Sequence, residues 1–73
     1  MKLPILSSAE LCKFLEKEGF VKVRQKGSHA FFKHVDGRTT VVPIHNKQDI
    51  SRGLLSAILN EINMSREEFL RKK

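Results

Sequence analysis

This 73-residue sequence lacks the features of secreted, membrane-bound and metal-dependent proteins. A single cysteine, Cys12, allows no intramolecular disulfide, and one cysteine with three histidines is a poor ligand set for structural zinc. The apolar segment Leu3–Leu6 is far shorter than the hydrophobic region of a signal peptide. We therefore expect a reduced, cytoplasmic protein with no metal, no cofactor and no membrane contact. At this length we expect one domain over residues 1–73, with no large internal pocket.

Acidic residues are scarce, and the excess of cations is concentrated in the middle of the chain. The sequence has 14 Lys and Arg against 8 Asp and Glu, a net charge of +6. Between residues 22 and 52, seven cations stand against two acids, which leaves a net charge of +5 there. These cations are Lys22, Arg24, Lys26, Lys33, Arg38, Lys47 and Arg52. Such clustering indicates a polyanionic partner such as RNA, because phosphates gain affinity by exchanging counterions for Lys and Arg. General solubility is the alternative explanation of the charge.

Three local patterns predict helices. Ser7–Glu10 has the Ser-x-x-Glu sequence of a capping box, so a helix is expected to begin there and to end at Gly19. Apolar residues at helical spacing predict a second helix that starts near residues 49–51. A second capping box at Ser65–Glu68 predicts a short last helix, and residues 71–73 are expected to fray.

The stretch between the first two helices predicts a three-stranded antiparallel meander. Alternating residues and two tight turns place the strands at residues 21–25, 28–34 and 39–42. Pro43 ends the third strand, and residues 44–49 form a polar loop. Each long helix carries one apolar stripe, so both are expected to cover the same sheet face. The predicted fold class is α+β, α-β-β-β-α with a short C-terminal helix, in the element order of double-stranded-RNA-binding domains.

The other face of this sheet is predicted to be basic. Val21 and Val23 are expected to face the core, which turns three cations of the same strand to the open side: Lys22, Arg24 and Lys26. If Ala30 and Phe32 point toward the helices, the open face also carries His29, Phe31 and Lys33. Two adjacent phenylalanines leave the opposite register, with Phe31 inside, open.

The turn Lys26-Gly27-Ser28-His29 is the best candidate for chemistry. Histidine is the side chain that both accepts and gives protons near neutral pH, and glycine lets the backbone approach a bulky anion closely. A phosphate suits such a site. A histidine at a turn is also often a plain surface residue, and the residues alone leave that alternative open.

The two other histidines are weaker candidates. His45 lies in the polar loop and is a candidate second acid or base if this loop folds back beside the turn. A loop histidine is more often a surface or hydrogen-bonding residue, so both interpretations of His45 stay open. His34 is expected to be partly buried and hydrogen-bonded near the end of its strand.

Several segments together resemble the HicA family of bacterial and archaeal toxins. They are Gly19-Phe20, Val23–His29, Phe32-Lys33-His34 with Asp36-Gly37, Val42-Pro43-Ile44-His45, and Gly53 with Leu55, Ile58 and Leu59. The resemblance spans residues 7 to about 63. The chain departs from the family pattern at Gly53-Leu54-Leu55, where Gly-Thr-Leu is usual, and its tail beyond Asn63 is longer than in short members.

This resemblance implies a fold like that of double-stranded-RNA-binding domains, cleavage of mRNA, and inhibition by a HicB antitoxin that covers the active site. It places the catalytic histidine at His29. Such an enzyme needs no metal, because RNA carries its own nucleophile, the 2′-OH. His29 is expected to remove the 2′-OH proton or to protonate the leaving 5′-oxygen. DNA, which lacks this hydroxyl, is not expected as a partner.

Phosphate binding is expected to fall to the basic face. The expected substrate-binding residues are Lys22, Arg24, Lys26, Gly27, Ser28, Phe31 and Lys33, with the cations on phosphate and Phe31 stacked on a base. Three functions compete: a ribonuclease, a non-catalytic RNA-binding domain that uses the same face, and a protein-interaction module that meets an acidic partner. We favour the ribonuclease, since a pure double-stranded-RNA binder is expected to have cations at a helix N-terminus and in loops as well. An antitoxin on the same face makes the third function compatible with the first.

Overall fold

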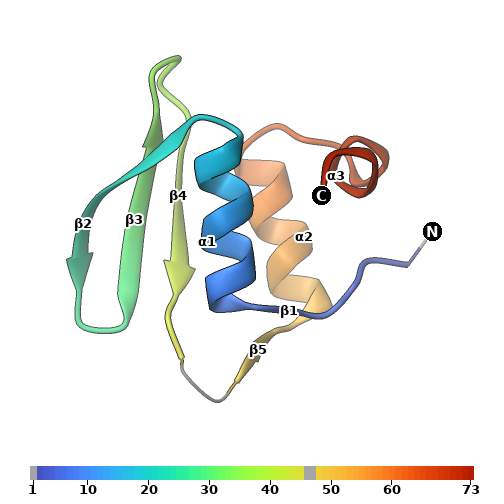
Figure 1. Cartoon of the computed structure of the whole chain (residues 1–73), viewed down its shortest axis with the longest axis horizontal. Coiled ribbons are helices and arrows are strands. Elements are labelled where there is room, and N and C mark those ends of the chain that lie inside the picture. Colours follow the sequence, from blue (N-terminus) through green and yellow to red (C-terminus); the bar gives the residue numbers. More distant parts are fainter. Residues whose placement is uncertain (1, 46–47) are drawn as a thin grey trace.

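Three helices and a three-stranded sheet make up the α+β fold of the computed structural model, which describes residues 2–45 and 48–73 (Figure 1). Lys47, one of the central cations, lies outside the described residues. The elements are β1 (Leu6–Ser7), α1 (Ser8–Lys17), β2 (Phe20–Lys26), β3 (His29–His34), β4 (Thr39–Pro43), β5 (Asp49–Ile50), α2 (Arg52–Glu61) and α3 (Arg66–Lys72). The predicted fold class, with the element order of double-stranded-RNA-binding domains, is confirmed.

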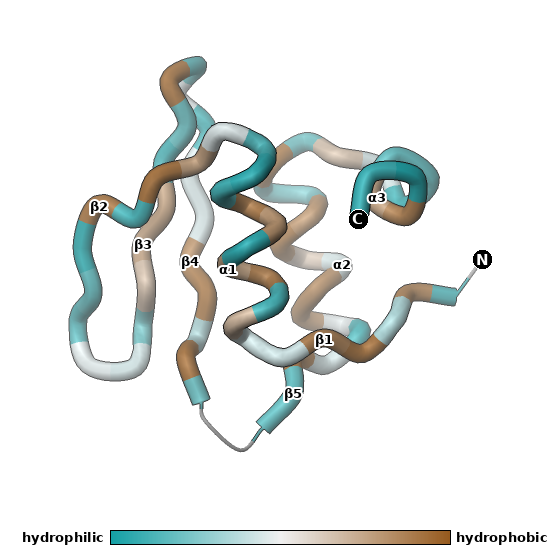
Figure 2. The backbone as a smooth tube through the Cα atoms, viewed as in Figure 1, coloured by the Kyte–Doolittle hydropathy of each residue, from teal (hydrophilic) through white to brown (hydrophobic). Residues whose placement is uncertain are grey.

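One face of the sheet is covered by helices and the other is open. The strand order is β2-β3-β4, with both pairs antiparallel, and α1 and α2 lie against the covered face (Figure 1). The sheet contributes five buried residues on that side: Phe20, Ala30, Phe32, Thr40 and Val42. Hydrophobic residues recur along α1, α2, β3 and β4, and are absent from the turn that joins β2 to β3 (Figure 2). The sheet therefore holds a polar turn at one end of a packed core.

The first helix begins and ends as its sequence predicts. Ser7 Oγ accepts from the Glu10 N–H at 3.1 Å, and Glu10 Oε1 accepts from the Ser7 N–H at 2.8 Å, so both halves of the capping box form. The helix ends at Lys17, and Gly19 follows with a φ of 93°. A Cβ at Gly19 would lie 2.9 Å from His34 Nε2, so both the backbone conformation and the close approach of the imidazole require glycine here.

The other two helices are also capped by serines. Ser51 Oγ accepts from the Leu54 N–H at 3.1 Å, which starts α2 inside the predicted range. Ser65 Oγ accepts from the Glu68 N–H at 3.0 Å and starts α3. The expected fraying after Leu70 is wrong, because α3 continues to Lys72, whose ammonium group lies 3.0 Å from Glu18 Oε1. This ion pair ties the end of the last helix to the end of the first.

The prediction for β2 is wrong about which side chains face the core. Val21 and Val23 are 62% and 58% exposed. Burial of the larger Phe20 sets the phase of the strand, because it pairs with His34 on the helix side and thereby turns Val21 outward, opposite Lys33.

A β-bulge between Lys22 and Arg24 then separates the cations of β2. Lys22 stands opposite the buried Phe32, on the helix side of this edge strand, where its Nζ donates to Gln25 Oε1 at 3.1 Å. Arg24 and Lys26 follow the bulge and face the open side. The expectation that three cations of β2 share the open face is therefore wrong for Lys22.

The register of β3 follows the predicted pattern, with Ala30 and Phe32 inside. The alternative with Phe31 inside is wrong. A second small sheet was not predicted: Leu6 and Ser7 of β1 pair with Ile50 and Asp49 of β5. The supposed polar loop therefore ends in a strand.

Candidate functional site

The turn between β2 and β3 holds Lys26 and His29 as direct cross-strand partners. Gly27 has a φ of 58°, and no heavy atom lies within 4 Å of a Cβ built on it, so backbone conformation alone requires glycine there. A positive φ at the first of two turn residues suits a tight hairpin of type II′. Side chains of directly paired residues lie on the same face with Cβ atoms about 5 Å apart. The turn thus fixes a cation beside an imidazole in solvent.

The open face around this turn is basic, with one aromatic ring. By strand register, it carries five of the predicted site residues: Arg24, Lys26, His29, Phe31 and Lys33. Arg24 Cζ lies 4.5 Å from the centre of the half-buried Phe31 ring, in a cation–π contact. One face of this ring is therefore covered by a guanidinium group. The structure brings all these residues together, and it leaves out Lys22.

The segment after β4 lies against the same turn. Pro43 is the partner of His29 in the sheet, and the Ile44 N–H donates to the Ser28 carbonyl oxygen at 2.5 Å. The next residue, His45, has its main chain fixed by the buried Ser8 hydroxyl, which accepts from the His45 N–H at 3.2 Å and donates to its carbonyl oxygen at 3.3 Å. His45 is a candidate second acid or base if its loop folds back beside the turn. The main chain of His45 does lie beside the turn. Its side chain is exposed.

Sequence patterns missed Ser8 and Pro43 as parts of this site. Ser8 acts on a residue 37 positions away, and no local pattern signals such a contact. Pro43 could have been found by counting the register of β3 and β4 outward from their turn, which places it opposite His29.

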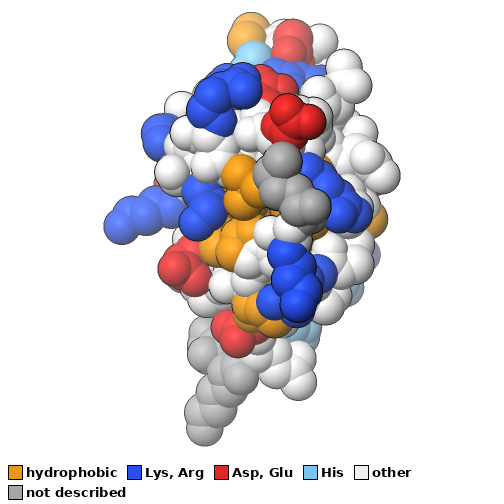
Figure 3. Space-filling model, turned by 90° about the vertical axis from the view of Figure 1, so that its right-hand side faces the viewer, with side chains coloured by type: hydrophobic (Ala, Val, Ile, Leu, Met, Phe, Trp, Pro, Cys, Tyr) orange, Lys and Arg blue, Asp and Glu red, His pale blue; other side chains and the backbone are white. Residues whose placement is uncertain are grey.

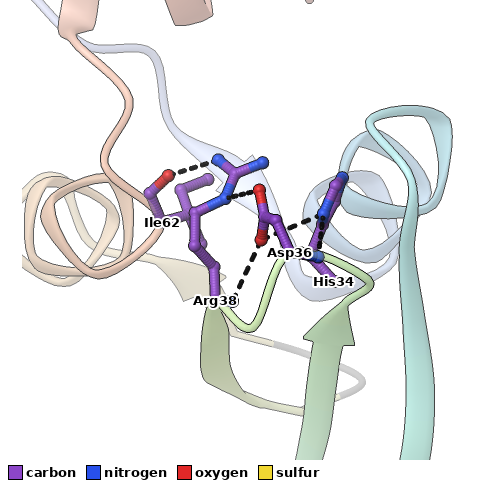
Figure 4. Close-up of polar contacts among 4 residues, drawn as sticks. All are labelled: His34, Asp36, Arg38 and Ile62. Atoms are coloured by element: carbon purple, nitrogen blue, oxygen red, sulfur yellow. Dashed lines mark hydrogen bonds and ion pairs between the residues drawn. The ribbon is translucent and has the colours of Figure 1, made fainter.

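His34 belongs to a separate structural cluster at the opposite end of β3 (Figure 4). Its ring packs edge-on against Phe20 at 5.0 Å, and its Nδ1 accepts from the Asp36 N–H at 3.1 Å. The Asp36 carboxylate accepts from Arg38 N–H and Nε, and these hydrogen bonds hold its pKa below the usual value. Arg38 Nη1 in turn donates to the Ile62 carbonyl oxygen at 2.6 Å, at the end of α2. The expectation of a partly buried, hydrogen-bonded His34 is confirmed.

Residues 2–45 and 48–73 contain neither a cluster of metal-ligating side chains nor a membrane-spanning helix. Over residues 2–45 and 48–73, no three His, Cys, Asp or Glu side chains are grouped so that they could hold a metal ion. In the same two ranges, no helix is long and apolar enough to cross a membrane. Burial raises the pKa of the Cys12 thiol, which disfavours the thiolate that a nucleophile needs.

Comparison with known families gives a match over most of the chain. The family model described as HicA toxin of bacterial toxin-antitoxin matches residues 8–64, from the first residue of α1 to the residue before the cap of α3. A search of curated proteins finds no match to this chain. The matched range contains the whole turn, the open face and the Ser8 contact with His45. It leaves α3 outside.

Proposed function

Because the chain belongs to the HicA family of toxins from bacterial toxin–antitoxin systems, we propose that it is a metal-independent endoribonuclease that cleaves mRNA, with His29 as its catalytic histidine. The observation that supports this most is the pairing of His29 with Lys26, on an open face that also carries Arg24 and Lys33. An imidazole that can transfer protons, beside cations that can bind a phosphate, provides what cleavage of RNA requires.

RNA brings the nucleophile to this reaction. A base removes the 2′-OH proton, and the freed oxygen attacks the adjacent phosphorus. The bond from phosphorus to O5′ then breaks, and an acid protonates O5′, which leaves a 2′,3′-cyclic phosphate and a 5′-OH. We assign one of the two proton transfers to His29. Lys26, its cross-strand partner, stabilises the charge that develops on the phosphate oxygens.

The remaining open-face residues are proposed to hold the RNA strand. Arg24 lies two residues before Lys26 on β2, and Lys33 lies four residues beyond His29 on β3, so both would contact phosphates farther along the RNA strand from the cleaved bond. Gly27 and Ser28 let the strand approach the main chain of the turn closely. Phe31 supports the Arg24 guanidinium, so the planar surface offered to a base is the guanidinium rather than the free ring. Lys22 is not part of this proposal, because it faces the helices.

His45 is the candidate for the second proton transfer. Its main chain is fixed next to the turn by Ser8 and by the neighbouring hydrogen bond from Ile44 to Ser28. Two histidines on either side of one phosphate can divide the work of base and acid. His45→Ala is then expected to slow cleavage while leaving RNA affinity near that of the wild type.

The partner is proposed to be a HicB-like antitoxin that covers this face. A family of toxin–antitoxin systems implies an antitoxin in general. An inhibitor that covers the basic face would block RNA and the catalytic turn at once.

The metal and nucleophile requirements test this proposal directly. The purified protein should cleave single-stranded RNA in EDTA, and an oligonucleotide with a 2′-deoxy sugar at the cleaved position should resist. An all-DNA strand of the same sequence tests the need for the 2′-OH, and His29→Ala protein purified in the same way is the matched control for contaminating ribonucleases. Cleavage that needs an added divalent metal, or equal cleavage of DNA, would exclude the proposed chemistry. Binding of RNA without cleavage would favour the non-catalytic RNA-binding domain.

A further inference from the structure

A groove between α1 and α3 lies on the helical side of the molecule, away from the open sheet face. It has a volume of about 350 Å³. Its lining residues are Leu6, Glu10, Lys13, Phe14, Lys17, Phe69 and Lys73. Seen from that side, a group of hydrophobic side chains is bordered by several Lys and Arg side chains and by acidic side chains (Figure 3). Two of the lining residues lie beyond residue 64, where the family match ends.

Two phenylalanine rings of the core lie beneath the groove. Phe14 and Phe69 meet edge to face, with ring centres 4.8 Å apart and an angle of 74° between the planes. Phe69 is fully buried and Phe14 is 7% exposed. These rings belong to the core, so the floor has a fixed shape.

Helix α3 forms one wall of the groove, and polar contacts near its C-terminal end connect it to the end of α1. Lys17 Nζ donates to the Lys72 carbonyl oxygen at 2.7 Å, and Lys72 Nζ lies 3.0 Å from Glu18 Oε1. Lys72 also reaches Glu68 on its own helix at 3.4 Å. Because the walls are already joined, a ligand would need to order little of the protein in order to bind.

The rim of the groove is cationic. Lys13, Lys17 and Lys73 surround the floor, whereas the one acid, Glu10, already accepts a hydrogen bond from the Ser7 N–H. In the described part of the chain, neither Lys13 nor Lys73 forms an ion pair with a carboxylate. An apolar groove whose rim carries three lysines against one acid complements an amphipathic segment that carries acidic residues.

We propose that this groove is a second docking site for the antitoxin, and that it takes an acidic amphipathic segment with one bulky apolar side chain inserted over Phe14 and Phe69. The inference rests on the antitoxin partner of the proposed function, and not on its nuclease chemistry. Protein suits the groove better than RNA does, because neither Phe14 nor Phe69 has an open ring face on which a base could stack. A buried apolar anchor surrounded by charge pairs is a common source of binding energy in protein interfaces.

Occupation of this groove leaves the open sheet face free. A partner could cover the basic face with one part and reach the groove with another. Its affinity would then rise, because the second contact forms intramolecularly once the first has formed. Groove substitutions should therefore weaken neutralisation of the toxin without changing its activity on RNA.

The test uses the protein encoded by the reading frame adjacent to this gene, produced together with the His29→Ala toxin so that cells survive. In this background, Lys13→Glu/Lys73→Glu should weaken the complex at least tenfold in titration calorimetry. The matched control, Lys2→Glu/Arg71→Glu, makes the same charge change at exposed residues outside the groove and should stay within twofold. Lysines are changed rather than Phe14 or Phe69, because the rings support the core.

Equal affinity in the two double variants would overturn the proposal. A loss of RNA affinity in the groove variant, with no loss of partner affinity, would assign the groove to RNA and also overturn it. The affinity measurement needs no ribonuclease activity, so it stays informative even if the protein fails to cleave RNA. With His29 restored, the groove variant should cleave RNA at the wild-type rate.

Discussion

Phe31 and Phe32 are neighbours in β3, yet they belong to two regions of the molecule with different tasks. Phe32 is 1% exposed and packs under the helices, whereas Phe31 lies on the open face beneath the Arg24 guanidinium. The covered face is held by apolar packing, whereas the open face carries cations and His29 beside the exposed Val21 and the half-buried Phe31. Substitutions on the covered face should therefore change stability, and substitutions on the open face should change RNA binding and cleavage.

Truncation of the two phenylalanines tests this contrast most strongly. Phe32→Ala is expected to lower the free energy of unfolding by about 3–5 kcal/mol, because it leaves a cavity in the core. Phe31→Ala should lower it by only about 1 kcal/mol, through loss of the cation–π contact. Urea unfolding of both variants measures the difference. Similar losses in the two variants would contradict the assignment of the faces.

The cations of β2 sharpen the comparison on the binding side. Arg24→Ala/Lys26→Ala should weaken RNA binding and lower the slope of log affinity against log salt by about 1.4, since each cation accounts for about 0.7 on a single strand. Lys22→Ala should leave this slope unchanged, because the bulge turns Lys22 to the helix side. Binding of a short RNA at several salt concentrations measures both. If Lys22→Ala lowered the slope as much as Arg24→Ala, the basic face would have been placed wrongly.

The smallest expected effect lies at the start of α1. Ser7→Ala should cost about 1 kcal/mol of stability, because it removes the cap of the helix. The hydrogen bond from the Ser7 N–H lowers the pKa of Glu10 below its usual value of 4.5. A lowered pKa in the folded state stabilises the protein above the unfolded value, and this contribution is lost as the pH falls through the folded-state value.

The pH dependence at Glu10 can be measured against a neighbour on the same helix. The melting temperature of Glu10→Ala should lie below that of the wild type at pH 7, and the gap should shrink as the pH falls below about 4. Glu16→Ala removes an exposed acid without a capping role and is the matched control. A gap that stayed constant with pH would mean that the Glu10 carboxylate contributes nothing through its charge.

Local patterns predicted the helix starts at Ser7 and Ser65, because a capping box depends on residues a few positions apart, and the apolar spacing placed the start of α2 within residues 49–51, where Ser51 caps it. They also predicted the inward register of Ala30 and Phe32 as one of two alternatives. The phase of β2 was predicted wrongly, since competition between Phe20 and the valines for the core is settled by packing against α1 and β3. The pairing of β1 with β5 joins segments more than 40 residues apart, and no local pattern indicates it.

In the candidate site, too, local features could be predicted from the sequence and features that depend on tertiary structure could not. The turn around Gly27 and the open side of His29 could be predicted from the sequence, because a tight turn and strand alternation fix them. Lys22 and Arg24 face opposite sides of the sheet because of a β-bulge, and no pattern in the sequence predicts that bulge. The cation–π contact between Arg24 and Phe31 and the hydrogen bond from the His45 N–H to Ser8 Oγ form between residues that only folding brings together, so local patterns could not predict them. The catalytic role of His29 stays a prediction.

The most direct measurement of the central claim compares wild-type and His29→Ala protein in cleavage of the same RNA under single-turnover conditions in EDTA. His29 is exposed at the turn, so its removal should leave the melting temperature and the RNA affinity close to those of the wild type. The account predicts that cleavage falls at least about 10²-fold, as expected when a general acid or base is lost. Cleavage at the wild-type rate by the folded variant would contradict it.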